Sequence, residues 1–392
     1  MPNLKRGMMA AAGGGDSGTG QLWAWGGNSD GQLGIGTRIL HSSPVQIGDL
    51  ATWSNVTGSG AFGAAIKTDG TIWAWGDNEK GQLGQGDVIS RSSPVQIGSL
   101  TTWSKIRAGE PDGGVTIAIK TDGTLWTWGS GGNGCRGSGD ALDTSSPIQV
   151  GSLTTWETVA IERWAVIATK TDGTLWAWGR TIAYSLPRLT EDGASAFSSP
   201  VQVGFFDGSF QHTTDWARGE GKITCGIGLG GAIKTDGTLW VWGLNGNGQL
   251  GQGSVSYGSN SPIQVGSLTD WKSIQAFSQN SSTITGFLAV KTGGTLWSWG
   301  YGTKGQTGLG NVLKYSSPTQ IGSSTDWDSV TSNKKGMVAA TKTSGALFMW
   351  GSGEDGALGL GDTIDRSSPV QLGTDIWAAH DGASETTVAI RK

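Results

Sequence analysis

The residue types that most often carry out chemistry are few in this sequence, and they are scattered. The three histidines, His41, His212 and His380, lie far apart, and the sequence has no His-x-His, His-x-x-His or Cys-x-x-Cys pair. Such pairs bring two ligands to one metal ion, so we predict no transition-metal site. A phosphate-binding loop and a nucleophile elbow are also missing. We therefore expect no metal, no cofactor and no enzymatic activity.

Most of the repeated aspartates stand in one kind of segment. Asp69, Asp122, Asp172 and Asp236 each belong to a Lys-Thr-Asp-Gly-Thr run. An Asp-Gly pair between two apolar runs predicts a two-residue hairpin turn of type I′, so we assign these carboxylates to turns. Residues 28–31 resemble a calcium loop only weakly, because the downstream ligands are missing. A carbohydrate-active enzyme that uses acidic loop residues is the least favoured of our functional interpretations.

The best candidate for a binding site is a set of residues that departs from an otherwise regular pattern. Trp164 is the only tryptophan outside the repeated positions, and the segment 180–189 replaces a Gly-rich loop. Loops on a rigid scaffold commonly bind ligands, and Trp, Tyr and Arg dominate protein interfaces. The alternative is a loop that has drifted without function. The candidate binding residues are Arg163, Trp164, Arg180, Tyr184, Arg188 and Leu189.

The elements that position these residues are copies of one unit about fifty residues long. Trp-x-Trp-Gly occurs six times, and a seventh copy has Phe348 in place of the first tryptophan. A fixed period of this length indicates one supersecondary unit that is repeated along the chain. We assign structural roles to Trp23, Trp25, Trp73, Trp75, Trp126, Trp128, Trp176, Trp178, Trp240, Trp242, Trp297, Trp299 and Trp350.

Each unit has the pattern of four short antiparallel strands, A to D. Strand A begins near a lone tryptophan, B ends at Lys-Thr-Asp-Gly, C holds the Trp pair, and D holds Ser-Ser-Pro-Val-Gln. Proline cannot donate a ladder hydrogen bond, which suits an outer edge strand. Seven such units predict an all-β fold, a seven-bladed β-propeller of four-stranded antiparallel blades.

The two ends of the chain complete one blade between them. Residues 387–392 have the pattern of a strand B without its turn, and residues 18–25 that of a strand C without its predecessor. Three buried tryptophans contribute about 11–19 kcal/mol per blade, whereas ordering the backbone costs on the order of 50–100 kcal/mol. Each Trp pair must therefore pack on a neighbouring blade in a closed ring. We predict a tail or docking strap at 1–15 and one propeller at 16–392, with a shared blade of 16–50 plus 374–392 and intact blades near 53–98, 103–151, 156–204, 216–266, 271–322 and 327–373.

Most of the long connections fall on one face of this propeller. The A–B and C–D loops share that face, and we expect long A–B loops at 109–114, 219–230 and 277–285. The opposite face carries the B–C turns and the D–A links. One of these links, 205–214, is long and contains Phe205, Phe206 and Phe210, which either cover the propeller edge or contact a partner.

The composition excludes several classes of partner. The formal net charge is −4 and no basic run exceeds two residues, as at Lys334-Lys335, so we expect no nucleic-acid binding. No apolar stretch of 18 residues occurs, so we expect no membrane span. Cys135 and Cys225 lie in different units, and we expect no disulfide between them.

The N-terminal segment is either a flexible tail or a strap that docks on another protein. Its apolar run of about five residues is too short for a secretion signal. In the strap interpretation, Leu4, Met8 and Met9 make the contact with the partner.

The run Trp-Gly-x-Asn-x-x-Gly-Gln-Leu-Gly-x-Gly, fullest at 75–86 and 25–36, resembles the signature of the regulator-of-chromosome-condensation repeat family. The resemblance covers residues from about 18 to 392. It implies a seven-bladed propeller closed by a shared blade. The founding member of the family is a guanine-nucleotide exchange factor that also binds chromatin, and one bacterial relative is a secreted β-lactamase inhibitor. The near-identical repeats look like those of bacterial and bacteriophage members, and residues 1–15 are similar to the starts of some marine phage structural proteins.

These observations lead to one expected function and one alternative. We expect a non-catalytic propeller in a bacteriophage virion, as a decoration, fibre or tail protein that is assembled in the host cytoplasm. It would dock through its N-terminal tail and present its loop face to proteins, virion proteins first, or to surface glycans. The alternative is a soluble regulator in the cytoplasm or outside the cell, either an exchange factor or an enzyme inhibitor.

Overall fold

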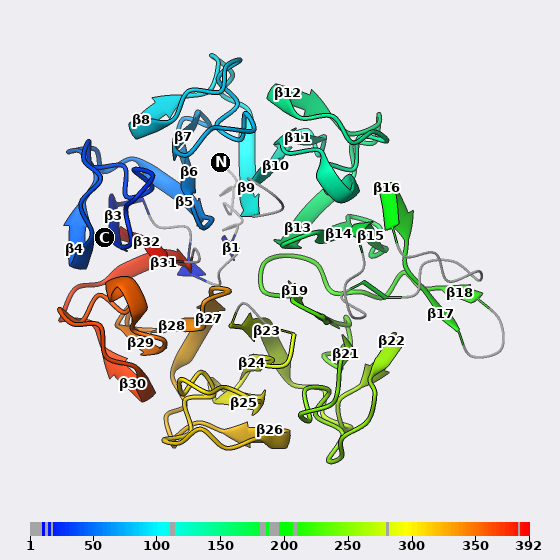
Figure 1. The fold of residues 1–392 in the computed structure, drawn as a ribbon. Helices are drawn as coiled ribbons and strands as arrows, with labels where there is room; N and C mark the ends of the chain where they lie inside the picture. Colours follow the sequence, from blue (N-terminus) through cyan, green and yellow to red (C-terminus); the bar gives the residue numbers. More distant parts are fainter. Residues whose placement is uncertain are drawn as a thin grey trace, which may run out of the picture.

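A computed structural model gives the structure of the protein. The structure describes residues 10–11, 15–16, 19–109, 114–180, 186–187, 196–206, 210–279, 282–382 and 385–392. Seven four-stranded antiparallel sheets are arranged as blades around a central axis (Figure 1). This arrangement confirms the predicted seven-bladed propeller.

The first four blades follow one another along the chain. Blade 1 consists of β5 (Trp53–Gly58), β6 (Phe62–Lys67), β7 (Ile72–Gly76) and β8 (Arg91–Gln96). Blade 2 consists of β9 (Trp103–Gly109), β10 (Val115–Lys120), β11 (Leu125–Gly129) and β12 (Thr144–Gln149). Blade 3 consists of β13 (Trp156–Glu162), β14 (Ala165–Lys170), β15 (Leu175–Arg180) and β16 (Ala196–Gln202). Blade 4 consists of β19 (Ile223–Gly226), β20 (Leu229–Ile233), β21 (Leu239–Gly243) and β22 (Ser259–Gln264).

The last three blades complete the ring, and the seventh joins the two ends of the chain. Blade 5 consists of β23 (Trp271–Ser278), β24 (Thr285–Lys291), β25 (Leu296–Gly300) and β26 (Tyr315–Gln320). Blade 6 consists of β27 (Trp327–Ser332), β28 (Met337–Lys342), β29 (Leu347–Gly351) and β30 (Arg366–Gln371). Blade 7 consists of β31 (Trp377–Gly382), β32 (Thr386–Arg391), β3 (Gln21–Gly26) and β4 (His41–Gln46). The pairing of β32 with β3 confirms that the terminal strands share one blade.

Two short hairpins lie outside the blades. Near the N-terminus, β1 (Ala10–Ala11) pairs with β2 (Gly15–Asp16), and Figure 1 places β1 at the centre of the ring. The link after blade 3 contains β17 (Gly204–Phe206) and β18 (Phe210–His212), which Figure 1 shows at the outer edge of the ring. The two interpretations of the phenylalanines in this link both stay predictions.

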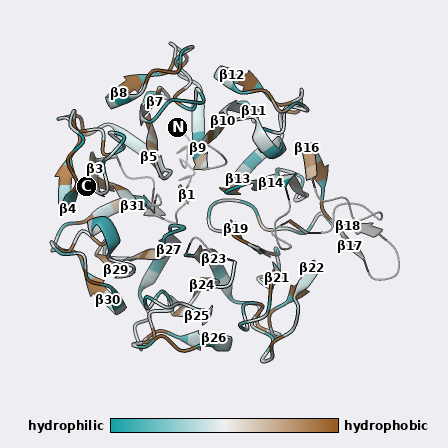
Figure 2. Ribbon diagram, viewed as in Figure 1, coloured by the Kyte–Doolittle hydropathy of each residue, from teal (hydrophilic) through white to brown (hydrophobic). Residues whose placement is uncertain are grey.

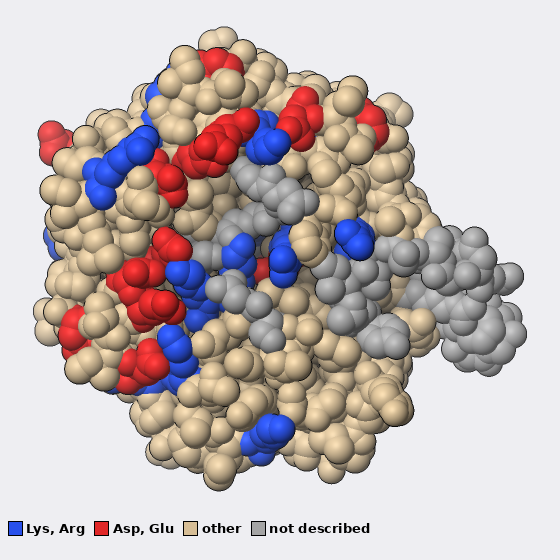
Figure 3. Space-filling view, in the orientation of Figure 1, with Lys and Arg blue, Asp and Glu red and all other residues tan. Residues whose placement is uncertain are grey.

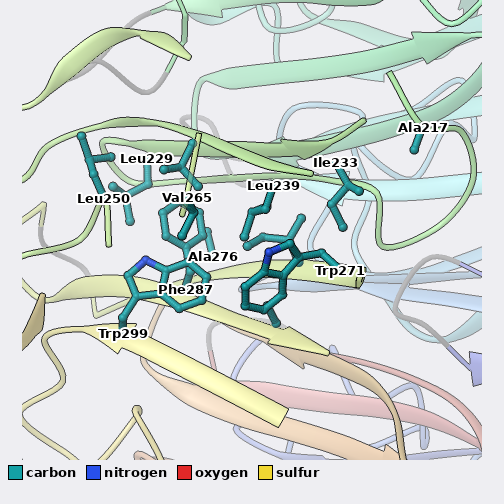
Figure 4. Close-up of a cluster of buried hydrophobic side chains, with 13 residues drawn as sticks. Ala217, Leu229, Ile233, Leu239, Leu250, Val265, Trp271, Ala276, Phe287 and Trp299 are labelled. Atoms are coloured by element: carbon teal, nitrogen blue, oxygen red, sulfur yellow. The ribbon is translucent and has the colours of Figure 1, made fainter. Parts of the chain in front are cut away.

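The core of the protein lies between the blades. The second tryptophan of each pair is fully buried, and each hydrophobic cluster joins residues of two neighbouring blades. In the cluster drawn in Figure 4, Trp299 and Phe287 of blade 5 pack against Leu250 of blade 4. The indole nitrogen of Trp299 also donates a hydrogen bond of 2.8 Å to the Gln249 carbonyl across this interface. Apolar residues are accordingly spread over all seven blades (Figure 2).

The repeated Lys-Thr-Asp-Gly-Thr segment builds a turn that differs from the predicted type I′. Only Gly123 of the Asp122-Gly123 pair has a positive φ, 76°, whereas type I′ requires positive φ at both positions. The amide of Gly123 donates to the Lys120 carbonyl, and the amide of Lys120 donates to the Thr124 carbonyl. The connection is therefore a three-residue loop with glycine in the left-handed region, and the prediction of a two-residue turn was wrong.

The polar residues of the same segment support the tryptophans. The Asp122 carboxylate accepts hydrogen bonds from the amide and hydroxyl of Thr124, and the Thr124 hydroxyl accepts one from the Trp126 indole. The Lys120 ammonium lies 3.6 Å from the centre of the Trp126 ring, where the cation and the aromatic face attract each other. These contacts give the repeated segment a structural role, in agreement with the assignment of its aspartates to turns.

A Gly-x-x-Gly-x-Gly loop between strands C and D holds each of six blades to the next one. We call this loop the clamp; the six clamps are residues 31–36, 81–86, 134–139, 248–253, 305–310 and 356–361. In the second of them, the Gly86 amide donates to the Ser145 carbonyl of blade 2, and the Gln82 carbonyl accepts from the Trp128 indole. A Cβ atom at Gly84 would lie 2.8 Å from the Trp128 nitrogen, so the loop approaches the ring this closely only with glycine.

Blade 4 departs from the pattern of the other blades. Trp216 was expected to begin its strand A, but it forms only an isolated bridge with Lys234, and β19 begins at Ile223. Residues 217–222 are therefore an insertion before strand A. The predicted long A–B loop at 219–230 was wrong, because β19 lies within that range and β20 begins in it.

Two further expectations concern the membrane and the cysteines. None of the helices in the described part of the chain has the length and apolarity to cross a membrane. Cys135 and Cys225 are buried, free thiols.

Candidate functional site

The innermost strands enclose a polar cavity of about 120 Å³ at the centre of the ring. Strand A of every blade runs along this cavity, so its walls come from side chains and backbone of all parts of the chain. Charged residues of both signs line it: Arg107, Glu162, Arg163, Glu220, Lys334 and Asp381. The cavity lies beside the loop face, by which we mean the face that carries the A–B and C–D loops.

An ion pair crosses the cavity between blades that are not neighbours. Arg107 on β9 of blade 2 donates a hydrogen bond of 2.9 Å to Glu220 in the insertion of blade 4. Lys105, also on β9, lies 3.6 Å from the other Glu220 oxygen. The Glu220 side chain is only 1% exposed, so its charge needs these two cations. The insertion thereby reaches across blade 3.

Two further carboxyl groups face the cavity. Burial raises the pKa of Glu162 to about 7; Arg163 opposes this shift and Asp381 adds to it. One oxygen of Glu162 accepts no hydrogen bond. Burial also raises the pKa of Asp381. Part of this increase is offset by the Arg107 charge and by hydrogen bonds from Thr57 and from the amides of Gly58 and Gly382. Burial therefore favours the neutral form of both carboxyl groups in this cavity.

We predict that Glu162→Gln stabilises the protein at pH 8 and not at pH 4. The folded-state pKa of Glu162, about 7, lies above its ordinary value of 4.5, so stability falls as pH rises through this interval. Removing the carboxylate should raise the free energy of unfolding by about 1–3 kcal/mol at pH 8. Urea denaturation of both proteins at each pH measures the difference.

Because His380 also changes the stability with pH, the effect of Glu162→Gln must be measured relative to the unmutated protein at each pH. Burial lowers the pKa of His380 to about 4, so this residue withdraws stability as pH falls below about 6.5. Both proteins contain His380, and its effect cancels in their difference. An equal gain from Glu162→Gln at pH 4 and pH 8 would contradict the assignment of the shift to the Glu162 carboxyl.

Three of the predicted binding residues come together, and one of them, Arg163, lines the cavity. Arg163 and Trp164 form the tight A–B connection between β13 and β14, and Arg163 has a positive φ of 49°. The Arg163 guanidinium lies 4.2 Å from the centre of the Trp164 ring, and that of Arg180 lies 5.9 Å from it. Arg180 also donates to the Asn133 side chain at 3.2 Å. We call Arg163, Trp164 and Arg180 the Arg–Trp–Arg cluster.

The remaining predicted site residues are not placed by the structure. Tyr184, Arg188 and Leu189 of the binding set lie outside the described residues, as do Leu4, Met8 and Met9 of the docking tail. Their assignment stays a prediction.

The charges on the loop face are unevenly distributed. In Figure 3, several Lys and Arg side chains lie near the centre of the ring and others lie toward the rim, whereas Asp and Glu atoms lie mostly away from the centre. The outer acidic groups are partly paired; for example, Lys335 contacts Asp355 at 3.3 Å and Glu385 at 2.6 Å. Arg163 and Arg180 thus place two cations beside the aromatic side chain of Trp164.

The other titratable groups near the centre have structural roles. His380 is buried and pairs with the Thr331 hydroxyl at 2.8 Å. Burial raises the pKa of the Cys225 thiol, which keeps it protonated and a poor nucleophile. Within the described residues, no three His, Cys, Asp or Glu side chains are grouped so that they could hold a metal ion.

The sequence does not predict Glu220, Arg107 or Asp381 as site residues. The predicted loop at 219–230 contains Glu220 but lies on the wrong side of strand A. Arg107 and Asp381 stand at equivalent positions of two A strands, where Thr57 stands in blade 1. Charged residues at this inner repeat position were the available signal for a polar cavity.

Comparisons with known proteins agree with the repeat pattern. The family model described as "Regulator of chromosome condensation (RCC1) repeat" matches residues 19–66, 69–110, 236–283, 293–332 and 344–376, more than half of the chain. A second model with the same description matches residues 54–82. The chain is 28% identical over 279 residues to the ultraviolet-B receptor UVR8 of Arabidopsis thaliana. The aligned segment covers 66% of this chain and 56% of UVR8. The chain thus spans little more than half the length of that relative.

Solved structures share the fold at low sequence identity. Prp20p from Saccharomyces cerevisiae has a TM-score of 0.77 and 18% identity, with 96% of this chain and 92% of Prp20p covered. Human WBSCR16 has a TM-score of 0.78 and 18% identity, with 95% and 100% covered. Together with the repeat matches and the seven blades, these findings show that the chain belongs to the regulator of chromosome condensation (RCC1) repeat family.

Proposed function

We propose that this chain is a non-catalytic propeller that binds a protein partner at the centre of its loop face. The observation that carries the proposal is the Arg–Trp–Arg cluster, whose Arg163 lines the polar cavity. Prp20p, which shares this fold, is described by its binding to Gsp1p and histones, so such propellers can bind proteins.

The chemistry of the cluster favours an acidic partner segment. Trp164 is half-buried against the hydrophobic cluster between blades 2 and 3, which fixes its ring before a partner arrives. Arg180 is exposed, and a guanidinium that lies over an aromatic ring still offers its N–H groups to a carboxylate in the ring plane. Arg and Trp are the residue types that most often dominate binding energy in interfaces.

We expect the double variant Arg163→Glu/Arg180→Glu to lose affinity for an acidic peptide at least tenfold. The probe is a fluorescein-labelled peptide of alternating Glu, Asp and Trp residues, measured by fluorescence anisotropy at low and at physiological salt. Its binding to the unmutated protein should weaken as salt rises, because exposed charges are screened.

A matched control separates the cluster from the general charge of the face. Lys80 and Lys304 lie on the same face in exposed or half-exposed ion pairs. Lys80→Glu/Lys304→Glu makes the same change of net charge and should alter the affinity less than twofold. Equal losses in the two double variants, or no binding of the peptide by the unmutated protein, would contradict the proposal.

More specifically, we propose that the chain is a bacteriophage virion component. The alternative is a soluble exchange factor or enzyme inhibitor. The similarity of residues 1–15 to phage structural proteins and the near-identical repeats support the virion role. Its test is the presence of the chain in purified virus particles and its loss from them when residues 1–15 are deleted. Stimulated nucleotide release from a small GTPase would instead support the alternative.

A further inference from the structure

The sequence between strands C and D of blade 3 lacks the glycine pattern that the other six blades share in this loop. Each of these six loops is a clamp whose last glycine donates its amide to a strand D carbonyl of the next blade, as Gly253 does to Ser316. In blade 3 the corresponding segment, 181–195, contains a single glycine, Gly193. The Gly-x-x-Gly-x-Gly pattern that lets the loop approach the neighbouring tryptophan is therefore absent from the sequence at the seam between blade 3 and blade 4.

The insertion of blade 4 makes contacts from this seam to three other blades. We call residues 217–222 the brace. Arg218 donates a hydrogen bond of 2.6 Å to the Thr171 carbonyl of blade 3. Glu220 pairs with Arg107 of blade 2, and Lys222 donates to the Lys272 carbonyl of blade 5.

We propose that the buried ion pair of Glu220 in the brace holds the blade 3–blade 4 seam closed, at the one seam whose C–D loop lacks the glycine pattern. Glu220 is the part of the brace with the least exposed side chain, and it ties blade 4 to blade 2 with blade 3 between them. Separating blade 3 from blade 4 would pull Glu220 away from Arg107 and Lys105. The brace therefore makes the opening of this seam depend on one carboxylate.

The two cysteines report on two different seams. The Cys225 thiol on β19 donates to the Ala165 carbonyl of blade 3 at 3.6 Å, so it lies in the braced seam. Cys135 belongs to the clamp of blade 2, and its carbonyl accepts from the Trp178 indole of blade 3. Both side chains are buried, so each thiol reacts with a reagent only when its own seam opens or the whole protein unfolds.

The experiment measures alkylation of each cysteine by N-ethylmaleimide under native conditions, with mass spectrometry of the two peptides. Glu220→Ala should raise the rate at Cys225 at least tenfold and leave the rate at Cys135 within twofold. Glu220→Gln keeps the size of the side chain and should act in the same direction if the alanine variant does not fold. Glu354→Ala, which breaks an exposed ion pair with Lys304, should change neither rate.

Two outcomes would overturn the proposal. An unchanged rate at Cys225 in both Glu220 variants would show that the ion pair does not hold this seam. A rise by the same factor at both cysteines would show that Glu220 supports the whole fold and not one seam. Arg107→Gln removes the other partner and should reproduce the selective rise at Cys225.

Discussion

Trp299→Ala is expected to lower the free energy of unfolding by about 3–5 kcal/mol. Trp299 is fully buried, packs on Trp271, Phe287 and Leu250, and donates its indole hydrogen to the Gln249 carbonyl of blade 4. The change opens a cavity between two blades and leaves that carbonyl without the indole donor. The midpoint of urea denaturation, followed by far-ultraviolet circular dichroism, measures the loss.

The first tryptophan of the same pair provides the control. Trp297 stands two residues earlier on β25, is half-buried, and contacts Trp271 and Lys291 within its own blade. Trp297→Ala should cost less than half as much as Trp299→Ala, because less apolar area returns to water. Equal losses would contradict the conclusion that the interfaces between blades, more than the blades themselves, carry the stability of the ring.

The fold could be predicted because its determinants recur in every unit. One tryptophan pair does not specify a blade, but seven copies at one spacing fix the strand order and the face that each strand buries. The shared blade followed from two incomplete units at the ends of the chain. The hairpin type was predicted wrongly, because Asp-Gly occurs both in two-residue turns and in three-residue loops with glycine last, and the sequence does not separate them.

The candidate site was predictable only in part, for a reason that blade 4 illustrates. From Trp216 to Lys234 the sequence advances 18 positions, whereas from Trp53 to Lys67 it advances 14. The difference reveals an insertion but not whether it precedes or follows strand A, since both arrangements keep the terminal Trp–Lys contact. The Arg107–Glu220 ion pair joins residues that are far apart in the sequence, so no local sequence pattern predicts this contact.

Deleting residues 385–392 is expected to abolish the folded ring. These residues contain β32, which lies between β31 and β3 and pairs with both. Val388, Ala389 and Ile390 are fully buried, so the deletion removes core residues as well as both hydrogen-bonded ladders. Blades 6 and 1 would each lose a neighbour at the same time. We expect loss of the cooperative thermal transition in circular dichroism, compared with a sharp one in the intact chain.

A circular permutant tests whether closure or the identity of the ends is required. Arg391 pairs with Gln21 and lies 4.2 Å over the Trp23 ring, the place that Lys67 takes beside Trp73 in blade 1. A Thr-Asp-Gly linker from Arg391 to Gln21 therefore recreates the B–C connection of the other blades, and new ends between residues 98 and 102 fall in a surface link. We expect this permutant to fold with a thermal midpoint at least equal to that of the natural order, because the shared blade becomes continuous. Cooperative melting of the shortened chain would show that the ring does not depend on the joining of its terminal strands, and a permutant that failed to fold would show that closure alone is not sufficient.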